Sequence, residues 1–179
     1  MAAGGGAALK ALSSINNDLD IYGIDYSNSL IDIAKNAIKN GNFYCGEAIE
    51  VDSAFGDKRF DFIFSNSAFH YFPNENYVFS VIKKAHSLLK PNGNFALLDL
   101  NDKKKKDIYN KIRKGNMSED EYNKKYDGLN HLFLDRCDVF SVAESLGFRQ
   151  IIIEDQHIKG YINNKCRFNI IMVGKKGEG

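Results

Sequence analysis

The chain has 179 residues and a formal net charge of +1, and 44% of its residues are hydrophobic. This length fits a single domain, the small net charge creates no overall field that would attract nucleic acid or an anionic membrane, and no apolar run is long enough to cross a bilayer. The cysteines, Cys45, Cys137 and Cys166, are widely spaced and indicate neither a disulfide framework nor a zinc site. We therefore expect reduced thiols in a cytoplasmic protein and assign no metal site.

The first half of the chain predicts alternating strands and helices. Residues 20–25 (DIYGID) read as a strand that ends on a carboxylate. Ser27 can cap the helix that follows, and Gly41 suits the left-handed position after its last turn. Residues 42–46 (NFYCG) predict a second, weaker strand. Residues 58–65 (KRFDFIFS) predict a third, because aromatic residues alternate along them.

The next segment continues this alternation. Asn74 can cap a helix with an apolar stripe from Val78 to Leu89, and Pro91 ends that helix before Gly93 turns the chain. Residues 95–100 (FALLDL) form an apolar run that is typical of a strand buried on both faces. The order of elements favours a mostly parallel sheet with flanking helices.

Residues 101–134 are rich in Lys, Asn, Asp and Tyr, and we interpret them as a cap or lid inserted into one domain that spans residues 1–179. Two short helices are expected there, at residues 107–115 and 118–126. The aromatic side chains of the insert either line an acceptor pocket or form a small core of their own: Tyr109, Tyr122, Tyr126, His131 and Phe133.

The last part of the chain predicts a helix and two strands. Asp135 can cap a helix that ends before Gly147. The strands expected at residues 150–153 and 168–173 are joined by a short connection with no obvious helix, so we predict that they pair antiparallel.

Asp25 and the three consecutive glycines, Gly4, Gly5 and Gly6, are the first candidate site. A carboxylate at a strand end, about 20 residues past a glycine-rich turn, can accept hydrogen bonds from both hydroxyls of a ribose. Glycines let a cofactor approach the backbone before a helix N-terminus, which favours negative charge. The competing interpretations are a capping aspartate and a flexible terminal stretch.

Further candidates follow two later strands. Glu47, with the Ala48 N–H, can hold the edge of an adenine, although a solvated surface glutamate is the alternative. Asn66, Ser67 and His70 lie just past the third strand, where open α/β sheets bind ligands. An imidazole can act as a base near neutral pH. The alternative is that His70, beside two phenylalanines, packs or makes a structural hydrogen bond.

Five segments together resemble class I S-adenosylmethionine-dependent methyltransferases over nearly the whole chain. They are GIDYS (23–27), GEA (46–48), RFDFIFSNSAFHYF (59–72), LLKPNGNFALLDL (88–100) and DRCDVFSVAESLGF (135–148). The resemblance implies an α/β, doubly wound Rossmann-like methyltransferase sheet, mostly parallel with a C-terminal antiparallel strand pair. It also implies S-adenosylmethionine as the cofactor and a small-molecule methyl acceptor.

The resemblance also assigns roles to the candidate residues. Asp25, with the adjoining Tyr26, would bind the ribose, and Glu47 with Ala48 would bind the adenine. The three glycines would face the methionine portion, and Asn66 and Ser67 would contact the cofactor from the third predicted strand.

One departure from the family pattern concerns the start of the chain. The family places a central strand before the glycines, where this sequence has three residues. We therefore expect that the chain is incomplete at its N-terminus, that residues 1–8 are not native, or that a partner chain supplies the strand. Activity of the chain by itself and its oligomeric state are left open. Alternative functions are a nicotinamide-dependent oxidoreductase and a non-catalytic binding protein of the same fold.

Overall fold

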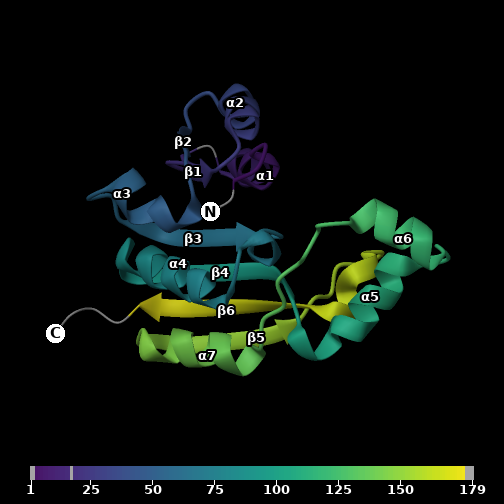
Figure 1. The fold of residues 1–179 in the computed structure, drawn as a ribbon. Helices are drawn as coiled ribbons and strands as arrows, with labels where there is room; N and C mark the ends of the chain where they lie inside the picture. Colours follow the sequence, from purple (N-terminus) through teal and green to yellow (C-terminus); the bar gives the residue numbers. More distant parts are fainter. Residues whose placement is uncertain (1–2, 17, 176–179) are drawn as a thin grey trace.

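The strands form two separate sheets in the computed structural model, which describes residues 3–16 and 18–175 (Figure 1). The smaller sheet pairs β1 (Tyr22–Asp25) in parallel with β2 (Asn42–Cys45). The larger sheet has the order β3-β4-β6-β5, and its members are β3 (Phe60–Asn66), β4 (Leu89–Asn101), β6 (Arg167–Lys175) and β5 (Phe148–Asp155).

The larger sheet combines parallel and antiparallel pairing. β3 runs parallel to β4, whereas β6 runs antiparallel to both β4 and β5. Three of its four strands therefore share one direction, and the last two strands of the chain form the expected antiparallel pair. The α/β fold predicted from the sequence is confirmed.

Six of the α-helices lie around these sheets in three pairs. In Figure 1, α1 and α2 lie beside β1 and β2, α4 and α7 lie over the larger sheet, and α5 and α6 project beyond one end of it. The bounds are α1 Ala7–Ile15, α2 Asn28–Ala37, α3 Val51–Phe55, α4 Glu75–Ser87, α5 Lys106–Lys114, α6 Glu119–Tyr126 and α7 Arg136–Ser145. The two helices expected in the insert are thus confirmed as α5 and α6.

Side-chain caps start three of these helices where the sequence predicts them. Ser27, Asn74 and Asp135 each accept a hydrogen bond from a backbone N–H in the first turn of α2, α4 and α7. Such caps satisfy donors that have no partner within the helix. Local chemistry therefore decides where these elements begin.

The main hydrophobic core lies between the larger sheet and the helices α3, α4 and α7. Phe95 and Leu97 of β4 and Ile170 of β6 are fully buried there. The opposite face of the sheet is more open, since Phe62 is 50% exposed and Ile152 is 36% exposed. The sheet is therefore covered unevenly by the described residues.

The boundaries of β4 differ from the sequence prediction. The strand begins at Leu89 and includes Pro91 and Gly93, which the sequence assigns to a turn. Its pairing with β3 jumps from Phe60↔Leu89 to Phe62↔Asn94, so the intervening residues bulge out of the ladder. This accommodates Pro91, which has no N–H to donate. Two segments predicted without helix also contain helical turns: residues 48–55 and Ile162–Cys166.

A gap in strand pairing separates the two sheets. β1 and β3 each end their own sheet, and they do not pair with one another. Among the described residues no strand lies between them, as the departure from the family pattern led us to expect. No helix in the described part of the chain is long and apolar enough to span a membrane.

Candidate functional site

Asp25 joins the end of β1 to the glycine turn. Its Oδ2 accepts a hydrogen bond from the Gly4 N–H at 2.8 Å, and its Oδ1 accepts one from the Ser27 N–H at 3.0 Å. The Ala3 N–H adds a bond to the Ile24 carbonyl at 2.9 Å. Asp25 is 5% exposed, so in this structure its carboxylate holds the glycine turn against β1. Its predicted ribose contact remains a prediction.

The glycine turn packs tightly against α2. Gly4 and Gly6 have positive φ angles of 53° and 78°, which favour glycine. A Cβ on Gly6 would lie 3.1 Å from the Ala34 Cβ, and one on Gly5 would lie 3.2 Å from Ile33 Cγ2. No side chain caps α1, and its first turn carries no acid. The exposed backbone N–H groups at this helix start suit a carboxylate ligand.

Glu47 and Ala48 follow β2, close to Asp25, because the Gly46 N–H donates to the Asp25 carbonyl at 2.9 Å. Glu47 forms a capping box with Glu50 and also accepts a hydrogen bond from the Tyr77 hydroxyl at 3.1 Å. Ala48 is buried. Glu47 is thus held in place by its neighbours at a strand end.

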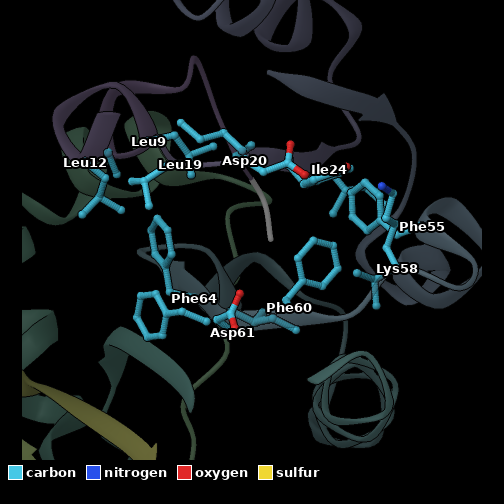
Figure 2. Close-up of a pocket in the computed structure, with 18 of the residues that line it drawn as sticks. Leu9, Leu12, Leu19, Asp20, Ile24, Phe55, Lys58, Phe60, Asp61 and Phe64 are labelled. Carbon is cyan, nitrogen blue, oxygen red and sulfur yellow. Dashed lines mark hydrogen bonds between the residues drawn. The ribbon is translucent and has the colours of Figure 1, made fainter. Parts of the chain in front are cut away.

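An apolar groove of about 680 Å³ lies between the two sheets. Figure 2 shows Leu9, Leu12 and Leu19 on one side of it and Phe60 and Phe64 on the other. Gly4 and Gly5 also line this groove, and so does Asn66 at the end of β3. Tyr26 lies outside this lining and is 74% exposed.

A buried polar network occupies the ends of β3 and β4. The Asp99 carboxylate accepts hydrogen bonds from the Ser67 hydroxyl, from the Tyr161 hydroxyl at 2.9 Å and from Arg167 Nη1 at 3.4 Å. Arg167 Nη1 also donates to the Asp99 carbonyl at 2.8 Å. A shift in the β4–β6 register between Leu97 and Leu100 produces the irregularity that turns Asp99 toward these partners.

His70 joins this network through Arg167. Arg167 Nη1 lies 3.0 Å from His70 Nδ1. Because a guanidinium only donates hydrogen bonds, Nδ1 is the acceptor and the ring proton lies on Nε2. Burial lowers the pKa of His70 to about 3, and smaller contributions to this shift come from the charges of Arg167 and His131. A general base works best with a pKa near the working pH, so this geometry favours His70 as a hydrogen-bond donor over the predicted base.

A second cavity, of about 480 Å³, lies between this network and the insert. We call it the acceptor pocket, after one of the two interpretations that the sequence analysis gave for the aromatic residues of the insert. Three of the insert's predicted pocket residues line it, namely Tyr109, Tyr126 and His131. The other two pack beside them, with Tyr122 against Tyr126 and Phe133 against Tyr109. The remaining lining residues are Ser67, His70, Tyr71, Ile112, Arg113, Leu129, Tyr161, Ile162, Asn163 and Arg167.

The sequence analysis missed Asp99, Arg113, Tyr161 and Arg167. Asp99 carried a usable signal, because a carboxylate inside the apolar run FALLDL must find partners when it is buried. The other three carried no such signal, because their role depends on residues that are distant in the sequence and that folding brings beside them.

Residues 1–97 match the sequence model of a family described as "Methyltransferase domain". No curated protein sequence matches the chain.

Several solved structures share the fold. The PH0226 protein from Pyrococcus horikoshii OT3 superposes with a TM-score of 0.72 at 18% identity, covering 97% of this chain and 79% of that chain. The plantazolicin methyltransferase BpumL, solved in complex with a pentazolic desmethylPZN analog and SAH, gives a TM-score of 0.73 at 16% identity, covering 98% of this chain and 75% of that chain. An O-methyltransferase family protein from Burkholderia thailandensis gives 0.66 at 16%; the match covers 99% of this chain but half of that protein (50%).

Proposed function

The chain belongs to the methyltransferase-domain family, and we propose that it uses S-adenosylmethionine to methylate a small-molecule acceptor. One observation carries the proposal: the end of β3 contributes a residue to each of the two cavities. Asn66 lines the groove with the glycine turn, and its neighbour Ser67 lines the acceptor pocket. A donor and an acceptor bound on the two sides of this strand end would lie close together. BpumL, a neighbour of the same fold, was solved with SAH.

The residues present fit such a cofactor. The uncapped start of α1 can bind a carboxylate through backbone N–H groups, and Gly5 and Gly6 leave no room for side chains at that turn. Carboxylates at the ends of β1 and β2, from Asp25 and Glu47, suit the hydroxyl and amino groups of a nucleoside. The two carboxylates lie at the ends of the paired strands β1 and β2, and the glycine turn before α1 is hydrogen-bonded to Asp25.

The chemistry divides between cofactor and protein. When bound, S-adenosylmethionine supplies an activated methyl group: the acceptor's lone pair forms the new bond to carbon, and the electrons of the broken S–C bond stay on sulfur. The protein aligns the two molecules and excludes water. We propose that residues 101–134 serve as the cap that closes the acceptor pocket, and that His70 donates its Nε2 proton as a hydrogen bond to the acceptor.

Calorimetric titration with S-adenosylhomocysteine and, separately, with NAD tests the cofactor. We expect S-adenosylhomocysteine to bind and NAD not to bind. Asp25→Asn is expected to weaken binding by about tenfold or more, since a charge-assisted hydrogen bond is lost. Asp32→Asn, at an exposed position on α2 outside the groove lining, is the matched control. Binding of NAD instead would indicate an oxidoreductase, and binding of neither would indicate a non-catalytic member of the fold.

A further inference from the structure

The acceptor pocket is lined by positively charged side chains and by no negatively charged side chain. None of the residues that line it is an aspartate or glutamate, whereas two are arginines. Arg167 is paired with the buried carboxylate of Asp99 behind the wall. Arg113 has no carboxylate within ion-pair distance in the described part of the chain. Its charge is therefore available to a ligand.

Aromatic rings hold Arg113 in position. Its guanidinium lies 3.8 Å from the centre of the Tyr126 ring, and Nη1 donates to the Tyr109 hydroxyl at 3.3 Å. A guanidinium has five N–H donors, so most of them are unused by the protein. A fixed guanidinium with spare donors matches the two oxygens of a carboxylate.

None of the described residues that line the pocket is suited to remove a proton from an acceptor. His70 Nδ1 is occupied by the Arg167 donor. Burial lowers the pKa of His131 to about 4, and smaller contributions to this shift come from the charges of Arg113 and Arg167. Phenol hydroxyls ordinarily keep their protons at neutral pH. An acceptor that already carries its negative charge needs no such base.

We propose that the acceptor is a small planar carboxylic acid, bound at Arg113 between the tyrosines and methylated on its carboxylate. One oxygen of the carboxylate binds the guanidinium, and the other forms the bond to the methyl carbon. The S–C bond breaks with its electron pair on sulfur, and the product is a neutral methyl ester. No proton is released in this step. The transfer itself rests on the proposed methyltransferase function, whereas binding of the acid does not.

The test measures acid binding without cofactor. A panel of small aromatic acids, such as cinnamate and benzoate, is titrated into the full chain by ligand-observed NMR, each acid beside its own amide. We expect at least one acid to bind about tenfold or more tightly than its amide. Arg113→Gln should remove that preference and Arg113→Lys should keep part of it. Lys111→Gln, on the same helix but outside the lining, should leave it unchanged.

The outcomes separate this inference from the cofactor proposal. If every acid binds no better than its amide, or if folded Arg113→Gln keeps the preference, the carboxylate proposal is overturned even when S-adenosylhomocysteine binds. If acids bind as expected but S-adenosylhomocysteine does not, the pocket is an acid site and the methyltransferase function fails. With both bound, labelled methyl groups should appear as an ester that releases methanol in alkali; label that resists alkali contradicts the carboxylate as the accepting group.

Discussion

The Ser67 hydroxyl donates a hydrogen bond to the Asp99 carboxylate, and both residues have left-handed backbones, with φ angles of 54° and 62°. Such conformations are costly for residues other than glycine and persist where surrounding contacts hold them, often at functional sites. Here Ser67 directly follows β3 and lines the acceptor pocket, and Asp99 lies near the end of β4, behind the pocket wall. The strain therefore supports a functional role for this end of the sheet.

Asp99→Asn tests how far this network stabilises the fold. The change removes the negative charge beside Arg167, whose guanidinium is buried. Loss of one partner of a buried pair typically costs about 3 kcal/mol or more. Ser67→Ala, which removes a single hydrogen bond to the same carboxylate, should cost about 1 kcal/mol. Urea denaturation of both variants measures the difference, and equal losses would contradict the ion-pair assignment.

Stability should fall in mild acid because of His70. Its pKa of about 3 in the folded protein is below the unfolded value of 6.5, so the unfolded state binds the proton first. The stability that the neutral His70 imidazole contributes is therefore fully present above pH 6.5 and is lost as the pH falls toward 3. Between pH 6.5 and 5 this amounts to about 1.5 kcal/mol.

His70→Asn is the comparison for this pH dependence. Its side-chain oxygen can still accept from Arg167, but it does not titrate. Unfolding free energies at pH 6.5 and 5 should therefore differ less in the variant than in the natural protein. A variant that loses as much stability as the natural protein over this range would place the titrating group elsewhere.

Gly6→Ala should destabilise the turn before α1. The new methyl group would meet Ala34 at 3.1 Å, and the φ of 78° disfavours a side chain. Together these effects should cost about 3 kcal/mol. Gly147→Ala is the matched control, because its φ of 75° is similar but a Cβ there meets nothing within 4 Å. It should cost about 1 kcal/mol; similar losses in the two variants, measured by urea denaturation, would show that the close contact with α2 does not matter.

The groove between β1 and β3 should accept one further strand. The Ala3 N–H already bonds to the Ile24 carbonyl, so residues fused directly before Ala3 would continue along β1. A segment of about six apolar, β-branched residues placed there should cover the part of the groove that Tyr22, Phe60 and Phe62 line, leaving the end at Gly5 and Asn66 to the proposed cofactor. It should raise the unfolding temperature by about 4 °C or more. A Gly/Ser segment of equal length is the control. Equal unfolding temperatures for the two fusions would contradict this account of the groove.

Local sequence patterns determined where helices begin and where strands lie in this protein. Ser27, Asn74 and Asp135 identify helix starts because each satisfies backbone donors two or three residues away. Alternating and continuous apolar runs placed the strands, and the loose motifs along the chain indicated the methyltransferase family that the match of residues 1–97 shows. Such signals act over a few residues and can be read from them.

Tertiary structure alone decided the chemistry of the pocket. Arg167 lies 97 residues after His70, yet its guanidinium sets which imidazole nitrogen carries the proton. Likewise, Arg113 is an ordinary residue in a basic helix until folding sets it against Tyr126 and out of ion-pair reach of the carboxylates in the described part of the chain. The burial and charge of a side chain depend on neighbours brought together by the whole fold, and no short stretch of sequence contains them.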